Sequence, residues 1–221
     1  MQNLLANTWY DSCWWVCVIA MELGFSLRAE GFRHVPAAGP ALLVANHQSF
    51  LDPVAAGLAA QRRLHFLARK TLFRSWGLGW LIRSLNSIPV DQEGFAREGL
   101  RAILEQLKAG HAVLMFPEGN RSPDGKMHPF RPGIHLLIKR VAMPIVPIGI
   151  AGTYDAWPRH RAVPVPAPLL GRGGKGTVAV SIGRPLDSRR LAELPREQVL
   201  AELFGAVQKC QEQAERQRRK V

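Results

Sequence analysis

Short apolar runs alternate with longer segments of mixed polarity along most of the chain. Apolar runs bounded by turn-forming residues are typical of buried strands, and apolar residues at helical spacing are typical of helices. The predicted strands are residues 41–45, 64–68, 87–90, 112–116, 144–150 and 177–182. The predicted helices are residues 52–61, 72–85, 95–109 and 133–140. This alternation predicts an α/β fold with a single mixed, largely parallel sheet and helices on its faces.

Residues 4–27 are rich in apolar and aromatic side chains. The uninterrupted apolar run covers only residues 13–21, whereas a spanning helix needs roughly 20 apolar residues. No Lys or Arg precedes the run, which disfavours a secretory signal peptide. The aromatic residues here are Trp9, Tyr10, Trp14 and Trp15. Because such rings settle at the lipid–water boundary, we expect a membrane-associated helix that lies in the interface or dips into one leaflet. A core helix packed on the domain and a short span are the alternatives.

The chain divides into three parts. Residues 1–27 are the N-terminal helix, residues 28–190 the central α/β domain, and residues 191–221 a C-terminal helix with a basic tail. The tail is either solvated charge or a membrane attachment. Within the central domain, residues 156–176 are rich in Pro, Gly and basic residues, and a loop of this length is usually functional or mobile.

Composition narrows the class of protein and of partner. The chain has 221 residues, of which 47% are hydrophobic and 21% charged, a balance that excludes a disordered tail, a collagen-like fibre and a polytopic membrane protein. Its formal charge of +12 calls for an anionic partner, such as nucleic acid, a membrane surface or a phosphorylated substrate. Three scattered cysteines are too few for a disulfide framework or a zinc site.

Residues 46–52, Asn-His-Gln-Ser-Phe-Leu-Asp, directly follow a predicted strand. Ligand sites in open α/β sheets collect beyond the carboxyl ends of strands. His47 is therefore well placed to act as a base, and Asp52 could hold its other ring nitrogen. The Ser49-x-x-Asp52 capping pattern predicts a helix that starts at Ser49 and leaves His47 in the loop. Asp52 alternatively serves only as a cap.

A second motif, Phe-Pro-Glu-Gly-Asn-Arg-Ser at residues 116–122, follows another predicted strand. Pro117 and Gly119 favour a tight turn that lets the backbone approach a ligand. Arg121 offers a bidentate fork for a phosphate. Glu118 would accept a hydrogen bond from a substrate hydroxyl or position the arginine. Taken alone, this motif would be only a turn with a surface charge.

Together the two motifs resemble those of the glycerolipid acyltransferase family, which includes 1-acylglycerol-3-phosphate acyltransferases. The resemblance covers roughly residues 25–185. Residues 145–148 look like the family's proline-containing strand motif, and residues 88–92 resemble its second motif. Two positions depart from the pattern, with Asn120 in place of Thr and Gln92 in place of Arg. These departures affect which residues would bind the phosphate of the acceptor and which acceptor the protein would use.

The resemblance implies a role for each motif residue. His47 is the general base on the acceptor hydroxyl, and Asp52 orients it. Glu118, Gly119 and Arg121 bind the acceptor. Arg69 and Lys70 match a region where the family often carries a basic residue near the acceptor phosphate, although they are equally interpretable as a solvated pair. Neither a cofactor nor a metal is implied, and the co-substrate is acyl-CoA or acyl-carrier protein.

The function that the resemblance implies is acylation of lysophosphatidic acid to phosphatidic acid by a catalytic domain at residues 28–190. We expect this activity at the cytoplasmic face of a bacterial inner membrane, with a lysophospholipid and an acyl thioester as partners. The same chemistry on another acceptor, such as a lyso-ornithine lipid, is the first alternative. A nucleic-acid-binding protein is disfavoured because no known binding signature occurs. A hydrolase using Ser49 or Ser122 is disfavoured because no G-x-S-x-G elbow occurs.

Overall fold

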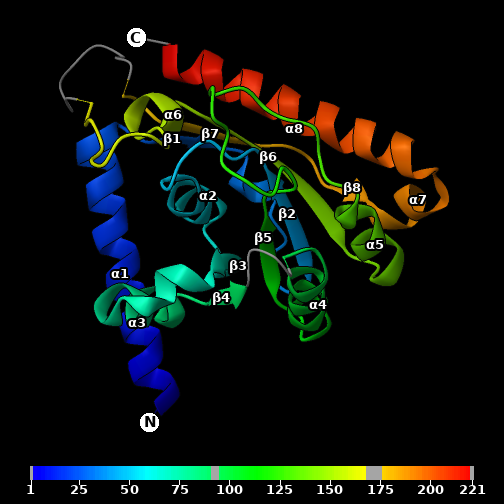
Figure 1. Cartoon of the computed structure of the whole chain (residues 1–221), viewed down its shortest axis with the longest axis horizontal. Coiled ribbons are helices and arrows are strands. Elements are labelled where there is room, and N and C mark those ends of the chain that lie inside the picture. The colour runs from blue at the N-terminus through cyan, green and yellow to red at the C-terminus, as the bar shows by residue number, and fades with distance from the viewer. Residues whose placement is uncertain (1, 91–94, 168–175, 220–221) are drawn as a thin grey trace.

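The computed structural model describes residues 2–90, 95–167 and 176–219, and these form one eight-stranded sheet flanked by helices (Figure 1). The strand order is β1-β7-β6-β2-β5-β3-β4, with β8 beside β6. The strands are β1 (Arg28–Glu30), β2 (Ala41–Ala45), β3 (Leu64–Arg69), β4 (Ser87–Val90), β5 (Ala112–Met115), β6 (Pro144–Ala151), β7 (Ala179–Ile182) and β8 (Leu186–Asp187). All neighbours are parallel except the pairs that β6 makes with β7 and β8. The predicted mixed, largely parallel sheet is confirmed.

Helices cover both faces of this sheet (Figure 1). One face carries α1 and α2, and the opposite face carries α4, α5, α7 and α8. The helices are α1 (Gln2–Phe25), α2 (Asp52–Ala60), α3 (Trp76–Ser84), α4 (Phe95–Lys108), α5 (Gly133–Arg140), α6 (Thr153–Ala156), α7 (Ser188–Glu193) and α8 (Arg196–Arg219). The two 3₁₀ helices are η1 (Phe32–His34) and η2 (Lys70–Arg74).

Strand β2 lies between the two cores. Leu43 joins the core under α1 and α2, whereas Leu42 and Val44 join the core under α4, α5 and α8. Successive side chains of a strand point to opposite faces, so a strand covered on both sides must be apolar at every position. This explains the unbroken apolar run at residues 41–45, and it fixes β2 at the centre of the sheet, where its carboxyl end is held rigidly.

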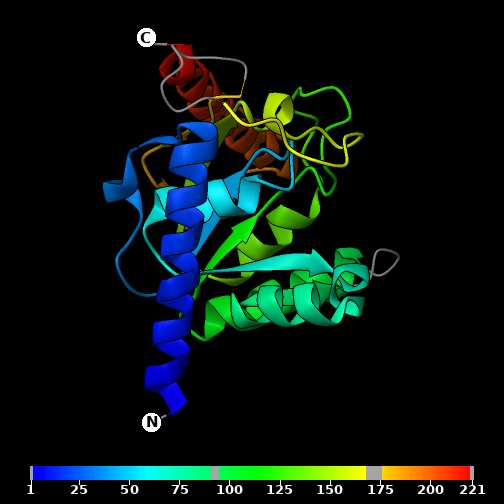
Figure 2. The ribbon, with the colours of Figure 1, turned by 90° about the vertical axis from the view of Figure 1, so that its left-hand side faces the viewer.

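Helix α1 runs along one side of the molecule, and its N-terminal part extends beyond the sheet (Figure 2). Met21 and Phe25 are buried in the core. The opposite face of the helix leaves Trp15, Val16, Ile19 and Leu23 between 54% and 65% exposed. Packing on the domain and an outward apolar face therefore coexist in one helix. Among the described helices, α1 included, none combines the length and the apolarity needed to cross a bilayer.

Two sequence predictions of helix extent are wrong. The single helix expected at residues 72–85 is η2 followed by α3, because Ser75 is extended at φ −73° and ψ 119°. Gly79 packs there against the backbone of Phe73, and a Cβ would lie 2.6 Å from the Phe73 carbonyl oxygen. Helix α2 begins at Asp52 rather than at Ser49, because the Ser49 hydroxyl accepts from the Leu51 N–H and closes a tighter turn first.

Candidate active site

The two motifs meet where the adjacent parallel strands β2 and β5 end. Val44 of β2 is in register with Met115 of β5, so the residues that follow the two strands emerge side by side. The Ser122 N–H donates to the carbonyl of His47 at 2.8 Å, which ties one loop to the other. The two motifs therefore lie side by side at one end of the sheet.

His47 and Asp52 form a hydrogen-bonded pair. His47 Nδ1 lies 2.7 Å from Asp52 Oδ2. The same oxygen accepts the backbone N–H groups of Gln48 at 2.5 Å and Ser49 at 2.6 Å. Asp52 is fully buried, whereas the His47 side chain is 18% exposed. Three donors on one carboxylate oxygen fix Asp52 as an acceptor, so Nδ1 carries the proton and Nε2 carries the lone pair.

Two further contacts orient His47. Its ring stacks on Phe116 with centroids 4.1 Å apart and an interplanar angle of 18°. The preceding residue, Asn46, is fully buried. Its amide donates to the Ile150 carbonyl at 2.9 Å and accepts the Ile150 N–H at 2.8 Å. Asn46 thus continues the pairing of β2 with β6 through its side chain. Sequence reasoning assigned it no role, although a polar residue directly after an apolar strand was the available signal.

Glu118 joins three segments of the site. Its Oε1 accepts the His47 N–H at 2.7 Å and its Oε2 accepts the His128 N–H at 2.9 Å. The residue is only 7% exposed, and burial raises its pKa to about 7 despite the two backbone hydrogen bonds, which lower it. In the structure Glu118 therefore holds the backbone around the base, a role that its sequence position alone does not reveal.

Gly119 makes the turn that carries Arg121. Its φ is +76°, and a Cβ would lie 2.5 Å from Arg131 Nε. Arg131 Nε in turn donates to the Glu118 carbonyl at 3.2 Å. A left-handed backbone and a close neighbour both favour glycine here. The sequence prediction of a tight turn at this position agrees with the structure.

Arg121 lies flat on Phe50 of the first motif. Its Cζ is 3.5 Å from the Phe50 ring centroid. Its Nη1 is buried and has no hydrogen-bond partner within the described residues. Burial and the nearby positive charges of Arg69 and Arg159 lower the pKa of Arg121, although Asp52 opposes this effect. An unpaired buried guanidinium N–H is costly, so the site is arranged to receive an anionic oxygen.

Arg69 and Lys70 separate in the structure. Arg69 Nη2 donates to Asn120 Oδ1 at 3.1 Å, which places Arg69 beside the motif at residues 116–122. Lys70 Nζ instead lies 3.2 Å from Glu98 on α4, and both side chains are almost half exposed. Arg69 rather than Lys70 therefore joins Arg121. The element that resembles the family's own second motif, residues 88–92, runs into residues 91–94, so Gln92 lies outside the described residues.

Neither candidate serine is arranged as a nucleophile. Ser49 Oγ donates to the Trp157 carbonyl at 2.8 Å, and Ser122 Oγ donates to Asp124 Oδ1 at 2.9 Å. Both hydroxyls are thus engaged away from His47. In the part of the chain that the structure covers, three or more His, Cys, Asp or Glu side chains nowhere gather to hold a metal ion.

Comparison with known proteins agrees with this geometry. Residues 26–151, more than half of the chain, match the family model described as Acyltransferase. A chloroplastic 1-acyl-sn-glycerol-3-phosphate acyltransferase of Brassica napus is 30% identical over 132 residues, which cover 58% of this chain but only 38% of that protein. The Bacillus subtilis enzyme of the same name is 24% identical over 196 residues, 86% of this chain and 91% of that one.

A relative with a different acceptor also matches. The lyso-ornithine lipid O-acyltransferase of Pseudomonas aeruginosa is 29% identical over 212 residues, 87% of this chain and 78% of that one. Among solved structures, the 1-acyl-sn-glycerophosphate acyltransferase PlsC of Thermotoga maritima superposes with a TM-score of 0.80 at 25% identity, over 100% of this chain and 84% of that one. The resemblance predicted from the motifs is confirmed, and the chain belongs to the Acyltransferase family.

Proposed function

We propose that this protein transfers a fatty acyl group from a thioester donor to the free hydroxyl of lysophosphatidic acid, giving phosphatidic acid. The observation that carries the proposal is the 2.7 Å pair of His47 and Asp52 beside an arginine with an unpaired buried N–H, in a chain of the Acyltransferase family. A base for a hydroxyl and a cation for a phosphate are the two groups that this acceptor requires.

The reaction uses the lone pair on His47 Nε2. This nitrogen takes the proton of the acceptor hydroxyl while the hydroxyl oxygen attacks the thioester carbonyl. The buried Asp52 carboxylate stabilises the imidazolium that forms. The tetrahedral adduct then collapses, the carbon–sulfur bond breaks, and the leaving thiolate recovers the proton from the imidazolium. The products are the ester and a free thiol, and His47 returns to its neutral state.

The first few methylene groups of the acyl chain are proposed to lie between α1, α2 and β3. A cavity of about 90 Å³ is lined there by apolar side chains that include Trp14, Val54, Leu58 and Phe66. Pro53, directly after Asp52, also lines this cavity, so it adjoins the segment that carries the base. The donor carrier is coenzyme A or acyl-carrier protein, both of which are anionic and suit the charge of +12.

Membrane association is proposed to occur through α1 and α3. Trp9 and Trp80 pack at a centroid distance of 4.9 Å, so the two helices touch. Trp76 is 92% exposed and Trp80 57% exposed. Large apolar side chains at this exposure are typical of surfaces that enter the lipid interface. A lysophospholipid acceptor would then reach the site from the bilayer, and we assign the protein to the cytoplasmic face of a bacterial inner membrane.

Lyso-ornithine lipid is the second candidate acceptor. It is supported by the Pseudomonas aeruginosa relative, which the match covers over most of its length, and by the two motif departures, Gln92 and Asn120. An ornithine headgroup has no phosphate, however, and would leave the Arg121 N–H without its best partner. The phosphorylated acceptor therefore ranks first.

The test is thiol release from a long-chain acyl-CoA in mixed micelles, with and without lysophosphatidic acid. Wild-type protein is compared with His47→Ala and with a control, His111→Ala. His111 directly precedes β5 and so lies at the amino end of that strand, whereas the site lies beyond its carboxyl end. We expect thiol release only when the acceptor is present. His47→Ala should abolish this release, and His111→Ala should preserve it. Melting curves establish that both variants fold.

Other outcomes of this assay would indicate a different activity, acceptor, base or donor. Release without acceptor would indicate a thioesterase. Release only with lyso-ornithine lipid would favour the second candidate acceptor. Undiminished turnover by a folded His47→Ala variant would exclude His47 as the base. If acyl-CoA gives no release with either acceptor, the same assay is repeated with acyl-carrier protein as the donor.

A further inference from the structure

A third arginine adjoins the pair described above. Arg69 ends β3, Arg121 lies in the loop after β5, and Arg159 lies in the loop after α6. Both Arg69 and Arg159 are close enough to Arg121 to disfavour its positive charge, and Asp52 is the carboxylate that opposes them. Three guanidinium groups from distant segments repel one another, and an anion bound between them would offset that repulsion. Their gathering therefore indicates a ligand with more than one anionic oxygen.

The loop that carries Arg159 is attached to the first motif through Trp157, two residues before it. Ser49 Oγ donates to the Trp157 carbonyl at 2.8 Å, and the rings of Phe50 and Trp157 lie 5.5 Å apart. Because Phe50 also carries the Arg121 guanidinium on its ring, one aromatic side chain touches both segments. The loop after α6 is thus attached to two residues, Ser49 and Phe50, that closely follow His47 in the first motif.

A short turn then presents Arg159 itself. The Arg161 N–H donates to the Pro158 carbonyl at 3.1 Å, and Trp157 Nε1 donates to the Arg161 carbonyl at 3.0 Å. Both bonds involve the backbone of Arg161 rather than its side chain. Pro158 is buried while Arg159 is exposed. The turn therefore has a fixed base and an accessible cation at its second position.

We propose that Arg159 is a specificity-determining residue that binds the phosphate of the acyl acceptor together with Arg69 and Arg121. The proposal rests on the proposed function. Arg159 would also supply the positive charge that the chain lacks at Gln92, where the family's own second motif has an arginine. The phosphate concerned is the acceptor's, because its hydroxyl must reach His47 and only a glycerol unit separates the two groups. The phosphates of an acyl-CoA lie at the far end of its pantetheine arm.

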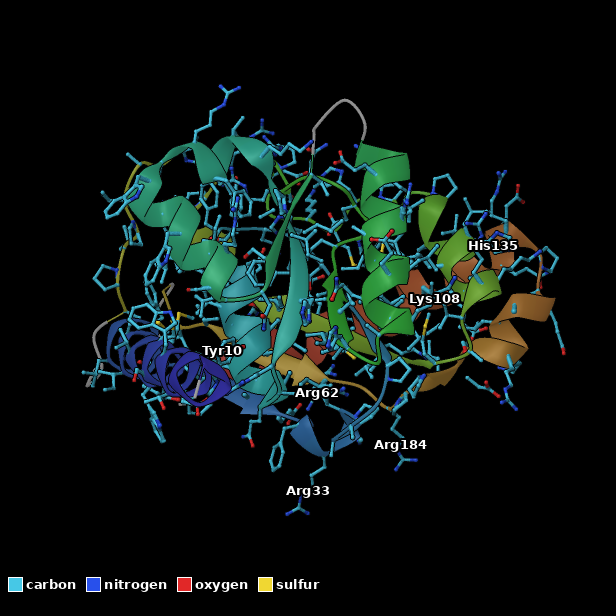
Figure 3. All side chains as sticks on the ribbon, turned by 90° about the horizontal axis from the view of Figure 1, so that it is seen from below. Tyr10, Arg33, Arg62, Lys108, His135 and Arg184 are labelled. Carbon is cyan, nitrogen blue, oxygen red and sulfur yellow. The ribbon has the colours of Figure 1, made fainter. Side chains whose placement is uncertain are left out.

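The experiment compares Arg159→Gln with two controls that lose the same charge. Arg161→Gln lies on the same turn and keeps the two backbone contacts; besides the charge it loses the bond of 3.4 Å that Arg161 Nη1 donates to the Asp155 carbonyl. Arg184→Gln is remote, because Arg184 follows β7, whose antiparallel pairing with β6 places its C-terminal end away from the carboxyl ends of β2 and β6. Its side chain projects from the margin of the view in Figure 3. Equal loss of charge matches the general attraction to anionic micelles in all three variants. The readouts are the KM for lysophosphatidic acid, the KM for acyl-CoA, kcat, and acceptor binding in the absence of donor.

For Arg159→Gln we expect the acceptor KM and the acceptor Kd to rise about tenfold, while kcat and the donor KM change less than twofold. Both controls should match wild type, and all variants should melt at the same temperature. An unchanged acceptor KM in an enzyme that acylates lysophosphatidic acid would overturn the inference and leave the proposed function standing. A rise in the donor KM alone would assign the charge to the donor instead. A wild-type protein active only on lyso-ornithine lipid would contradict both proposals.

Discussion

At the scale of single residues, Asp52 is the most constrained group in the site. One of its oxygens accepts three hydrogen bonds, while Oδ1 is buried without a partner among the described residues. Asn at this position places an amide N–H₂ in one of these two environments. We expect Asp52→Asn to lower kcat by about 10²–10⁴ and the free energy of unfolding by about 1–3 kcal/mol.

Steady-state kinetics and denaturant unfolding check this prediction. Asp11→Asn is the matched control, because the Asp11 carboxylate makes an exposed pair with Arg63 at 2.8 Å and such pairs contribute little to stability. If Asp52→Asn retains the wild-type kcat, the carboxylate is a structural cap only.

Glu118 predicts a dependence of stability on pH. Its pKa is about 7 in the folded protein, against an ordinary value of 4.5. Between these pH values the unfolded chain releases the proton and the folded protein keeps it. The free energy of unfolding therefore falls as the pH rises from about 4.5 to 7. Glu118 contributes a fall of roughly 2 kcal/mol between pH 5 and pH 8.

Glu118→Gln removes this titration, and urea unfolding at pH 5 and pH 8 measures the difference. The amide has a single acceptor oxygen, so the variant also loses one backbone hydrogen bond at every pH. The expected signature is thus a variant that is less stable at pH 5 and has a shallower pH dependence. Parallel pH profiles for the two proteins would show that Glu118 has an ordinary pKa.

The contact between His47 and Asp52 was predictable because one short motif contains both residues. The role of Glu118 was not predictable, since its partners are the backbone N–H groups of His47, 71 residues before it, and of His128 in the following loop, and since burial sets its pKa. The separation of Arg69 from Lys70 depends on Asn120 and Glu98, which the fold brings together from other elements. Adjacent sequence positions gave no means to tell the two cations apart.

At the scale of elements, α8 packs directly on β6. A Cβ on Gly149 would lie 1.9 Å from the Gln211 backbone nitrogen, so the backbones of strand and helix are in contact. We expect Gly149→Ala to push α8 away and to destabilise the fold by about 1–3 kcal/mol, the usual cost of overpacking.

Gly205 is the matched control within α8, because a Cβ there meets no atom within 4 Å. Gly205→Ala should stabilise the protein by about 0.5–1 kcal/mol through higher helix propensity. Thermal unfolding of both variants measures the contrast. Equal effects of the two substitutions would contradict close packing at Gly149.

Most of the elements were predictable because strong apolar periodicity marks them. The short elements β1, β8, α6 and α7 were missed, because they are too brief to show a period. Of these, the strands β1 and β8 are defined by their pairing with β7 and β6, which lie elsewhere in the chain. The division of residues 72–85 into η2 and α3 depends on the contact of Gly79 with Phe73, a packing detail that no local pattern encodes.

At the scale of the whole molecule, the apolar face of α1 predicts binding to lipid. We expect the double variant Trp15→Ser, Ile19→Ser to bind anionic vesicles at least tenfold more weakly than wild type, because both side chains are more than half exposed and their transfer into lipid stabilises the bound state. Vesicle sedimentation measures the bound fraction.

The control for vesicle binding is Leu136→Ser, which removes a side chain that is 51% exposed on α5, a helix on the opposite face of the sheet from α1 (Figure 1). It is compared with the single variant Ile19→Ser, which removes a side chain of similar exposure from α1. Equal losses of binding in these two single variants would show that the whole surface, rather than α1, contacts lipid.

The pairing of β1 with β7 has a consequence for synthesis. Arg28 is in register with Ala179, so about 150 residues must be made after β1 before its partner exists. At ~5–20 residues per second, that interval is on the order of 10–30 s. Met21 and Phe25 of α1 share a core with Val178 and Val180. Until these two valines have been synthesised, α1 lacks part of the apolar surface on which it packs. We therefore expect α1 of the nascent chain to bind lipid or a chaperone before the sheet is complete. Delivery to the membrane would then precede folding of the domain.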